Sequence, residues 1–367
     1  MKHNIVMKFS RILFLLFFAL TATFSVSASG ENAESKNETQ SSFNPQKLIF
    51  HHINDAYEWH ITTIGETHIS IPLPVIVYSK QTGFHVFMSS NFHHGAEAYQ
   101  GFKIAHEGKN EGKVVEIQPD GSEVRPVDIS ITKNVASLFI SIVLLLLIFL
   151  SVSKRYKENF ARAPKGIQSW VEPIIIFVRD DVAKAAIPGK YMKYLPYLLT
   201  IFFFIFLNNL LGLIPIFPGG ANLTGNIAVT MVLALITFFI TQFSSNKAYW
   251  THIINMPGVP WWLKFPVPLM PVIEIMGLFI KPFVLMIRLF ANITAGHIVA
   301  LAFYCLIFVF GEKNVFAGYG VSVVSVAFTV FMALIELLVA FIQAYVFTLL
   351  SAMYFGMAME SHEEHHE

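Results

Sequence analysis

Two very long apolar runs constrain the fold more than any other feature of the chain. Val272–Phe310 and Val321–Phe355 each continue for 35 or more residues with no turn signal that clearly divides them. As single helices they would each exceed about 50 Å at 1.5 Å per residue, against roughly 30 Å of bilayer hydrocarbon. Each run therefore either breaks into two spans or forms one inclined membrane helix. The lack of any turn signal in Val321–Phe355 favours two long, steeply inclined helices.

The remainder of the chain also has the character of a membrane protein. It is 54% hydrophobic and only 13% charged, whereas soluble domains average about 25% charged residues. Three further apolar stretches are long enough to cross a bilayer: Val135–Val152, Tyr194–Ile216 and Leu223–Phe243. The predicted fold class is therefore an all-α polytopic membrane protein embedded in the lipid bilayer. The net charge of +1 gives no support for binding of nucleic acid.

Flanking residues indicate how these segments are oriented. A basic cluster directly follows Val152, and the positive-inside rule assigns that end to the cytoplasm; its members are Lys154, Arg155, Lys157, Arg162 and Lys165. Ile167–Ala186 is amphipathic and is expected to lie as a helix on the inner surface. Its apolar face comprises Trp170, Ile174, Phe177 and Val178. Met256–Pro271, rich in Pro and Trp, is interpreted as an interfacial loop.

The amino terminus has the pattern of a signal peptide, residues 1–28. A basic start precedes the short apolar core Ile12–Leu20, and Val26-Ser27-Ala28 supplies small residues for cleavage. A first transmembrane helix is the alternative, but the run is short and the following residues are hydrophilic. Either interpretation places the segment from Ser29 to about Lys133 outside the cytoplasm.

This exported segment, residues 29–133, divides into a linker and a small domain. Gly30–Asn44 has little to bury and is expected to be disordered. Beyond Gln46, a strand-rich insert is predicted, with turns at Thr82-Gly83 and Pro119-Asp120-Gly121. The predicted strands are Thr67–Ile71, Val75–Tyr78, Val114–Ile117 and Val127–Ile131.

Histidine and cysteine usage in the chain does not form a compact metal motif. The insert contains eight histidines whose spacing favours solvated surface positions over a metal site or a proton-collecting surface; they are His51, His52, His60, His68, His85, His93, His94 and His106. The single cysteine, Cys305, lies in an apolar run and is interpreted as a small core residue. No metal site and no cofactor are predicted.

Arg288 is a charge within an otherwise apolar stretch, and a charged side chain at membrane depth usually has a function. Glu274, Lys281 and Arg288 are seven residues apart and share one side of a helix, and Glu336 and Gln343 have the same spacing on the last run. These faces should meet protein or water. Lys281 has the alternative of snorkelling to an interface, and Gln343, like Asn292, that of an interhelical hydrogen bond.

Three motifs of this chain resemble the F-type ATP synthase subunit a. Lys281-Pro-Phe-Val-Leu-Met-Ile-Arg-Leu-Phe-Ala-Asn-Ile-Thr-Ala-Gly-His297 resembles the signature that contains the family's arginine. Phe206-Leu-Asn-Asn-Leu-Leu-Gly-Leu-Ile-Pro215, followed by Thr224-Gly-Asn-Ile-Ala-Val-Thr230, resembles an earlier family motif, and Ile342-Gln-Ala-Tyr-Val-Phe347 its last helix. The resemblance covers about Val135 to Glu360, and the exported insert lies outside it.

The resemblance implies the stationary channel subunit of a rotary motor in the bacterial inner (plasma) membrane. Its channel domain would be residues 134–360, followed by a cytoplasmic tail at 361–367. The implied partners are the c-ring, whose subunits each carry an ion-binding carboxylate, and the subunit b peripheral stalk. Such a subunit couples proton translocation to ATP synthesis through two half-channels and has no catalytic site of its own. The alternative is a stand-alone proton channel or secondary transporter, which predicts inverted repeats that the sequence lacks.

The resemblance also implies roles for individual residues. Arg288 would face the ring, and Asn209 would be an inlet residue. Glu274 would lie near the inner half-channel, on the same side as Lys281. The outer half-channel would be lined by Asn292, His297, Glu336 and Gln343.

One departure from the family pattern concerns His297 and Glu336. Many bacterial relatives have an acid at the first position and a histidine at the second, so the two residues are exchanged here. The exchange keeps one carboxylate and one imidazole between the two helices. We hypothesise that the pair hydrogen-bonds and relays protons, because histidine titrates near neutral pH.

Overall fold

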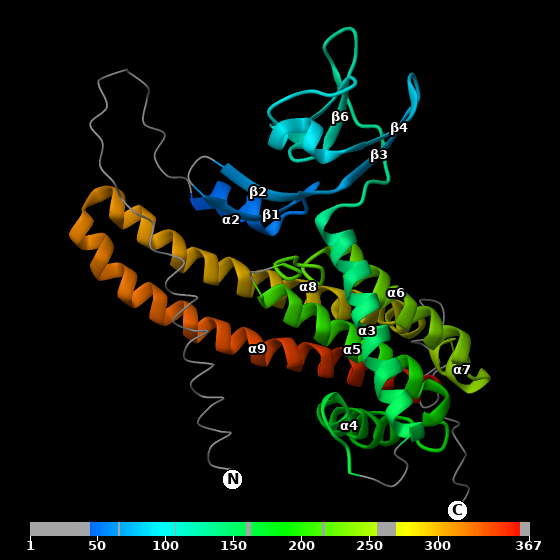
Figure 1. Ribbon diagram of the computed structural model, residues 1–367. Coiled ribbons are helices and arrows are strands. Elements are labelled where there is room, and N and C mark those ends of the chain that lie inside the picture. Colours follow the sequence, from blue (N-terminus) through cyan, green and yellow to red (C-terminus); the bar gives the residue numbers. More distant parts are fainter. Residues whose placement is uncertain are drawn as a thin grey trace, which may run out of the picture. The chain divides into compact units, whose positions relative to one another are not determined.

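The computed structural model describes residues 45–64, 67–106, 108–158, 163–214, 217–254 and 269–359. The signal peptide, the Gly30–Asn44 linker, most of the Met256–Pro271 loop and the 361–367 tail, each predicted from the sequence, lie outside these residues. Figure 1 shows small β-sheets in the N-terminal part of the chain and helices in the rest. Among the described residues, five helices are long and apolar enough to cross a membrane.

The helices agree with the predicted spans in number and order. Their bounds are α3 (Lys133–Glu158), α4 (Ile167–Phe177), η3 (Val178–Lys184), α5 (Tyr191–Leu213), α6 (Ile227–Ser244), α7 (Lys247–Ile254), α8 (Leu269–Lys313) and α9 (Val315–Met359). The prediction that the two last apolar runs do not break is confirmed. Each is one continuous helix of 45 residues, or roughly 67 Å at 1.5 Å per residue.

Three details differ from the sequence prediction. Helix α6 begins at Ile227 and not at Leu223, because the side chain of Asn226 accepts a hydrogen bond from the Ala228 N–H and caps the helix there. The short helix α7 was not predicted. Helix α8 starts at Leu269, inside the range assigned to the interfacial loop.

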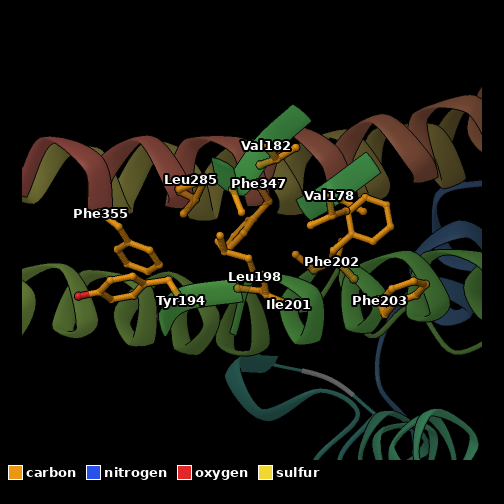
Figure 2. Close-up of a cluster of buried hydrophobic side chains, with 14 of the residues drawn as sticks. Val178, Val182, Tyr194, Leu198, Ile201, Phe202, Phe203, Leu285, Phe347 and Phe355 are labelled. Atoms are coloured by element: carbon orange, nitrogen blue, oxygen red, sulfur yellow. The ribbon is translucent and has the colours of Figure 1, made fainter. Parts of the chain in front are cut away.

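The membrane core lies where α5, η3, α8 and α9 meet. Figure 2 shows side chains from these four elements directed toward one another. Val178 and Val182 of η3 are fully buried, so the π-helical continuation of α4 turns its valines into this core. The Tyr194 and Phe355 rings, from α5 and α9, lie 5.1 Å apart. This packing holds the long helix α9 against the shorter span α5.

The insert contains three small antiparallel sheets. The sheet orders are β1-β2, β4-β3-β8 and β5-β6-β7. The elements are α2 (Pro45–Ile53), β1 (Glu58–Ile64), β2 (Thr67–Pro72), β3 (Pro74–Ser79), β4 (Gly83–Met88), η1 (Ser89–Gly95), β5 (Phe102–Ile104), η2 (Gly108–Asn110), β6 (Val114–Ile117), β7 (Glu123–Val124) and β8 (Val127–Asp128). All four predicted strands are confirmed, although β8 is shorter than expected. Both predicted turns connect neighbouring strands, β3 with β4 and β6 with β7.

A separate apolar core stabilises the insert. Val75, Val77, Phe92, Phe102 and Val114 are fully buried in it. At its margin the Tyr57 hydroxyl donates a hydrogen bond to the Asp128 carboxylate, and burial raises the pKa of Tyr57 above its ordinary value. The β-rich part is therefore a folded domain with an apolar core of its own.

Several histidines of the insert lie at its surface or beside polar side chains. The His85 ring lies within hydrogen-bonding distance of Gln100 and Thr82, and the His94 ring lies 2.9 Å from a Glu58 carboxylate oxygen. His93 and His94 are exposed. Within the described residues, no group of three or more His, Cys, Asp or Glu side chains is arranged to hold a metal ion.

Candidate functional site

Helix α8 carries the charged residues of the candidate site along one continuous axis. Because the helix is unbroken, Arg288 lies roughly 10 Å along the axis from Lys281 and roughly 14 Å from His297. The Arg288 side chain is exposed, as is that of Asn292 one turn further on. A permanent positive charge therefore stands on the open surface of α8, between two groups of polar residues.

The first group lines a small cavity between α5, α8 and α9, here named the Glu336 cavity. Its volume is about 10 Å³, close to the minimum that holds one water molecule. Four residues predicted from the sequence line it together: Asn209, Asn292, His297 and Glu336. Residues up to 127 positions apart in the chain thus converge on one cavity.

The Glu336 carboxyl group is pressed against the backbone of α8. A methyl group added to Gly296 would lie 2.6 Å from Oε1 and 3.2 Å from Cγ of Glu336. Oε1 is buried and accepts no hydrogen bond from the residues that the structure describes. Only a glycine at position 296 leaves room for this approach. The carboxyl oxygen therefore lies at the surface of α8, beside the cavity.

His297, the next residue, lies against α5. A methyl group added to Gly212 would be 3.7 Å from Nε2 of His297. The imidazole therefore occupies the space between α8 and α5, on the wall of the cavity that Glu336 also lines. This arrangement brings the exchanged acid and histidine to one water-sized space.

Asn209 is fixed within the same wall by two hydrogen bonds. Its amide nitrogen donates to the carbonyl oxygen of Ala340 on α9 at 3.1 Å, and its amide oxygen accepts from the Thr224 hydroxyl at 2.7 Å. Both Asn209 and Thr224 are buried. The hydroxyl of Thr224 was not singled out from the sequence as a site residue, although it belongs to the second family motif.

The second group lines a larger cavity of about 300 Å³, here named the Glu274 cavity. Glu274 and Lys281, seven residues apart on α8, both line it, as the helical spacing predicts. Lys281 Nζ lies 5.6 Å from the ring centre of Tyr354 on α9. An acid and a base of α8 therefore line the same space.

Helix α7 contributes two further polar residues to the Glu274 cavity. Tyr249 and His252 line it, and sequence reasoning missed both because α7 itself was not predicted. Burial raises the pKa of the Tyr249 hydroxyl above its ordinary value, and the charge of Glu274 adds to this effect. The polar and aromatic run Lys247–His252, directly after the α6 span, is the signal that could have identified them.

Two predicted residues are not brought into either cavity. Arg288 lines neither, and Gln343 is buried on α9, only 6% exposed. Gln343 lies two turns beyond Glu336 on the same helix. The structure thus places one group of predicted residues at the Glu336 cavity and one at the Glu274 cavity, and leaves Arg288 and Gln343 outside both.

Comparison with known proteins identifies a protein family over most of the membrane part of the chain. The family model described as ATP synthase A chain matches residues 135–356. A second model, described as a domain of unknown function, matches residues 48–134 and so covers the insert.

Individual relatives of the chain are named ATP synthase subunit a. ATP synthase subunit a of Pelodictyon phaeoclathratiforme is 48% identical over 248 residues, which cover 65% of this chain and 69% of that protein. ATP synthase subunit a of Chlorobium phaeobacteroides (strain DSM 266) is 42% identical over 295 residues, or 74% and 82% of the two chains. Since the matched family model spans more than half of the residues, the chain belongs to the ATP synthase subunit a family.

Proposed function

We propose that this chain is the stationary proton-channel subunit of a bacterial F-type ATP synthase. It would provide two half-channels, with Arg288 facing a rotating ring of carboxylate-bearing c subunits. The observation that carries the proposal is the exposed guanidinium on α8 with a polar cavity on either side along the helix axis. The subunit itself would have no catalytic site, and its ATP-forming partner subunits would use the rotation.

The charge of Arg288 explains how such a ring is driven. A ring carboxylate in lipid must be neutral, because burying it in the ionised form is prohibitive. Opposite a guanidinium the ionised form is favoured, so the carboxylate releases its proton there. Protons then leave the ring into one half-channel and load from the other, while Arg288 blocks a direct leak. Lysine would be a poorer substitute, because desolvation can neutralise it.

The Glu336 cavity is proposed as part of the outer half-channel. Its support is the convergence of Asn209, Asn292, His297 and Glu336 on a space of about 10 Å³. A carboxyl oxygen and an imidazole on the wall of one water-sized space can pass a proton directly or through one water. We assign the relay to His297 and Glu336. Gln343, on the Glu336 face of α9, would line the route between this cavity and the ring.

The Glu274 cavity is proposed as part of the inner half-channel. Its volume of about 300 Å³ is large enough for several water molecules. Glu274 would accept protons arriving from the ring, while Lys281 holds the local charge balance. His252 of α7 adds an imidazole side chain to the same wall.

The lengths of α8 and α9 support a steep inclination in the bilayer. A helix of roughly 67 Å that keeps its whole apolar length in about 30 Å of hydrocarbon lies at roughly 60° to the membrane normal. Two such helices, packed side by side, would present a broad surface to a curved ring. Subunit b of the peripheral stalk would hold this stator in place.

The proposed topology follows from the flanking charges. Residues 1–28 would be a signal peptide, and residues 29–133 would lie in the periplasm. The helices would span the inner membrane, and the 361–367 tail would lie in the cytoplasm. The basic residues Lys154, Arg155 and Lys157 at the end of α3 support the cytoplasmic assignment of that end.

The function is tested by Arg288→Ala, with Ile287→Ala as a matched control. Ile287 is the preceding residue of α8 and is 40% exposed, so both substitutions remove an exposed side chain from the same turn. Arg288→Ala should abolish proton-driven ATP synthesis while the complex still assembles, and Ile287→Ala should retain most of it. Synthesis and assembly are measured in membrane vesicles. Retained synthesis in Arg288→Ala would overturn the assignment.

A further inference from the structure

The insert presents an apolar sheet face that its own core does not cover. Tyr78, Phe84, Val86, Val127 and Ile129 are between 47% and 64% exposed. The strand register joins them, because Tyr78 is paired with both Phe84 and Val127, and Val86 with Ile76. Ile129 extends the face, since its N–H donates to the Ile76 carbonyl oxygen. These residues, with Ile76 and Met88, are named the outer apolar face.

The opposite side of the same sheet explains why this face is left open. Val75, Val77 and Phe87 alternate with the outer residues and are buried in the core of the insert. Strand residues alternate between the two faces of a sheet. One apolar face of this sheet is therefore buried in the core of the insert, and the other apolar face is exposed. Soluble domains rarely expose such a continuous apolar patch unless it meets a partner or a membrane.

Charge on the outer apolar face has one sign. No Asp or Glu occupies an outward position of β3, β4 or β8. Lys80 directly follows β3, Arg125 lies two residues before β8, and both are exposed. An aromatic and aliphatic surface with cations at its end is the pattern of a surface that lies on anionic lipid headgroups.

Chain continuity keeps the Ile129 end of this face close to the start of a membrane span. Only four residue steps separate Ile129 from Lys133, the first residue of α3, so the two Cα atoms are at most about 14 Å apart. The tether is also stiff. The Lys133 N–H donates to the Ala56 carbonyl oxygen at 2.8 Å, and the Asn134 N–H donates to Asp55 at 3.0 Å. The insert is thus fastened to the start of a membrane span.

We infer that the outer apolar face is a lipid-binding surface that docks on the bilayer next to the N-terminal end of α3. The sheet would lie against the headgroup region with Phe84 and Val86 inserted, and Lys80 and Arg125 directed at lipid phosphates. A protein covering this face, either a second copy or another subunit, would instead leave it away from lipid. The inference concerns the insert alone and does not depend on the roles proposed for α8 and α9.

Site-specific labelling of the full-length chain tests this inference. Cys305 is the single cysteine, so Cys305→Ser provides a background for Phe84→Cys, Val86→Cys and, as control, Ile117→Cys. Ile117 is an exposed strand residue, 39% accessible, in the β5-β6-β7 sheet. Each variant carries an environment-sensitive fluorophore and is reconstituted into vesicles of phosphatidylcholine and phosphatidylglycerol. Circular dichroism of each labelled chain verifies that it is folded.

The expected result is a blue-shifted emission at positions 84 and 86, with strong quenching by spin-labelled lipid and weak quenching by aqueous iodide. Position 117 should show the reverse. Equal iodide quenching at all three positions would overturn the inference, because the face would then be solvated. Protection of positions 84 and 86 from both lipid and iodide would also overturn it, because protein would then cover the face.

Discussion

At the scale of single residues, close approach decides what the ionisable groups of α8 and α9 can do. Glu336 could be recognised from the sequence as an acid in an apolar run. The sequence does not reveal that its carboxyl group rests on Gly296, where an added methyl group would meet it at 2.6 Å. The relay proposed for His297 and Glu336 depends on this contact, since both side chains line a cavity of only about 10 Å³.

Gly296→Ala should therefore displace the Glu336 carboxyl group and slow proton translocation, by about tenfold if the displacement raises the barrier by ~1.4 kcal/mol. Gly277→Ala is the matched control on the same helix, since an added methyl group there meets nothing within 4 Å. The control should pump normally and gain up to about 1 kcal/mol of helix stability. ATP-driven proton pumping by membrane vesicles measures both variants. Normal pumping by Gly296→Ala would contradict the proposed position of the relay.

At the scale of elements, the junction of α8 and α9 determines how the two long helices pack. They are separated by Asn314 alone, whose side chain accepts a hydrogen bond from the Phe316 N–H. A methyl group added to Gly318 would lie 2.8 Å from the Cα of Gly311. The backbones are in direct contact at this point. Further along, the Phe303 and Phe328 rings stack at 5.2 Å, so the helices remain side by side.

Gly318→Ala should force the two backbones apart and destabilise the hairpin by about 1–3 kcal/mol, the usual cost of overpacking. Gly320→Ala, two residues later, adds its methyl group to open space and should be close to neutral. Thermal unfolding of the purified full-length chain compares the two variants. An unchanged unfolding temperature for Gly318→Ala would mean that the helices separate there at little cost.

At the scale of the whole molecule, the insert and the first membrane helix are joined by more than the peptide chain. The Asp55 carboxylate accepts a hydrogen bond from the Asn134 N–H across 79 positions of sequence. It thereby satisfies one of the free N–H groups at the start of α3 and places a negative charge at the positive end of the helix. This hydrogen bond therefore joins the insert directly to the first turn of α3.

Asp55→Ala should remove this cap, cost about 0.5–2 kcal/mol and increase hydrogen exchange in the first turn of α3. Asp120→Ala is the control, because Asp120 accepts hydrogen bonds only from Ser122 within its own turn, among the interactions described for it. Its effect should stay within that turn. Hydrogen exchange of the full-length chain, resolved by peptide, makes the comparison. Equal protection of α3 in the wild-type chain and Asp55→Ala would show that the cap contributes little.

The amino-acid sequence determined the five membrane helices and half of the strands of the insert. Hydropathy and charge are local properties, and in a bilayer the backbone must satisfy its own hydrogen bonds, so an apolar run of sufficient length has to be a helix. The unbroken course of α8 and α9, and the position of Glu274 and Lys281 on one side of α8, followed from the same reasoning.

Only the tertiary structure decided which of these residues meet. The convergence of Asn209, His297 and Glu336 depends on the packing of three helices, and helix α7 became recognisable as part of the site through the cavity that it lines. The open face of the insert likewise depends on which side of its sheet the core occupies. Contacts between distant residues come from the way surfaces fit together, and no local pattern of sequence encodes that fit.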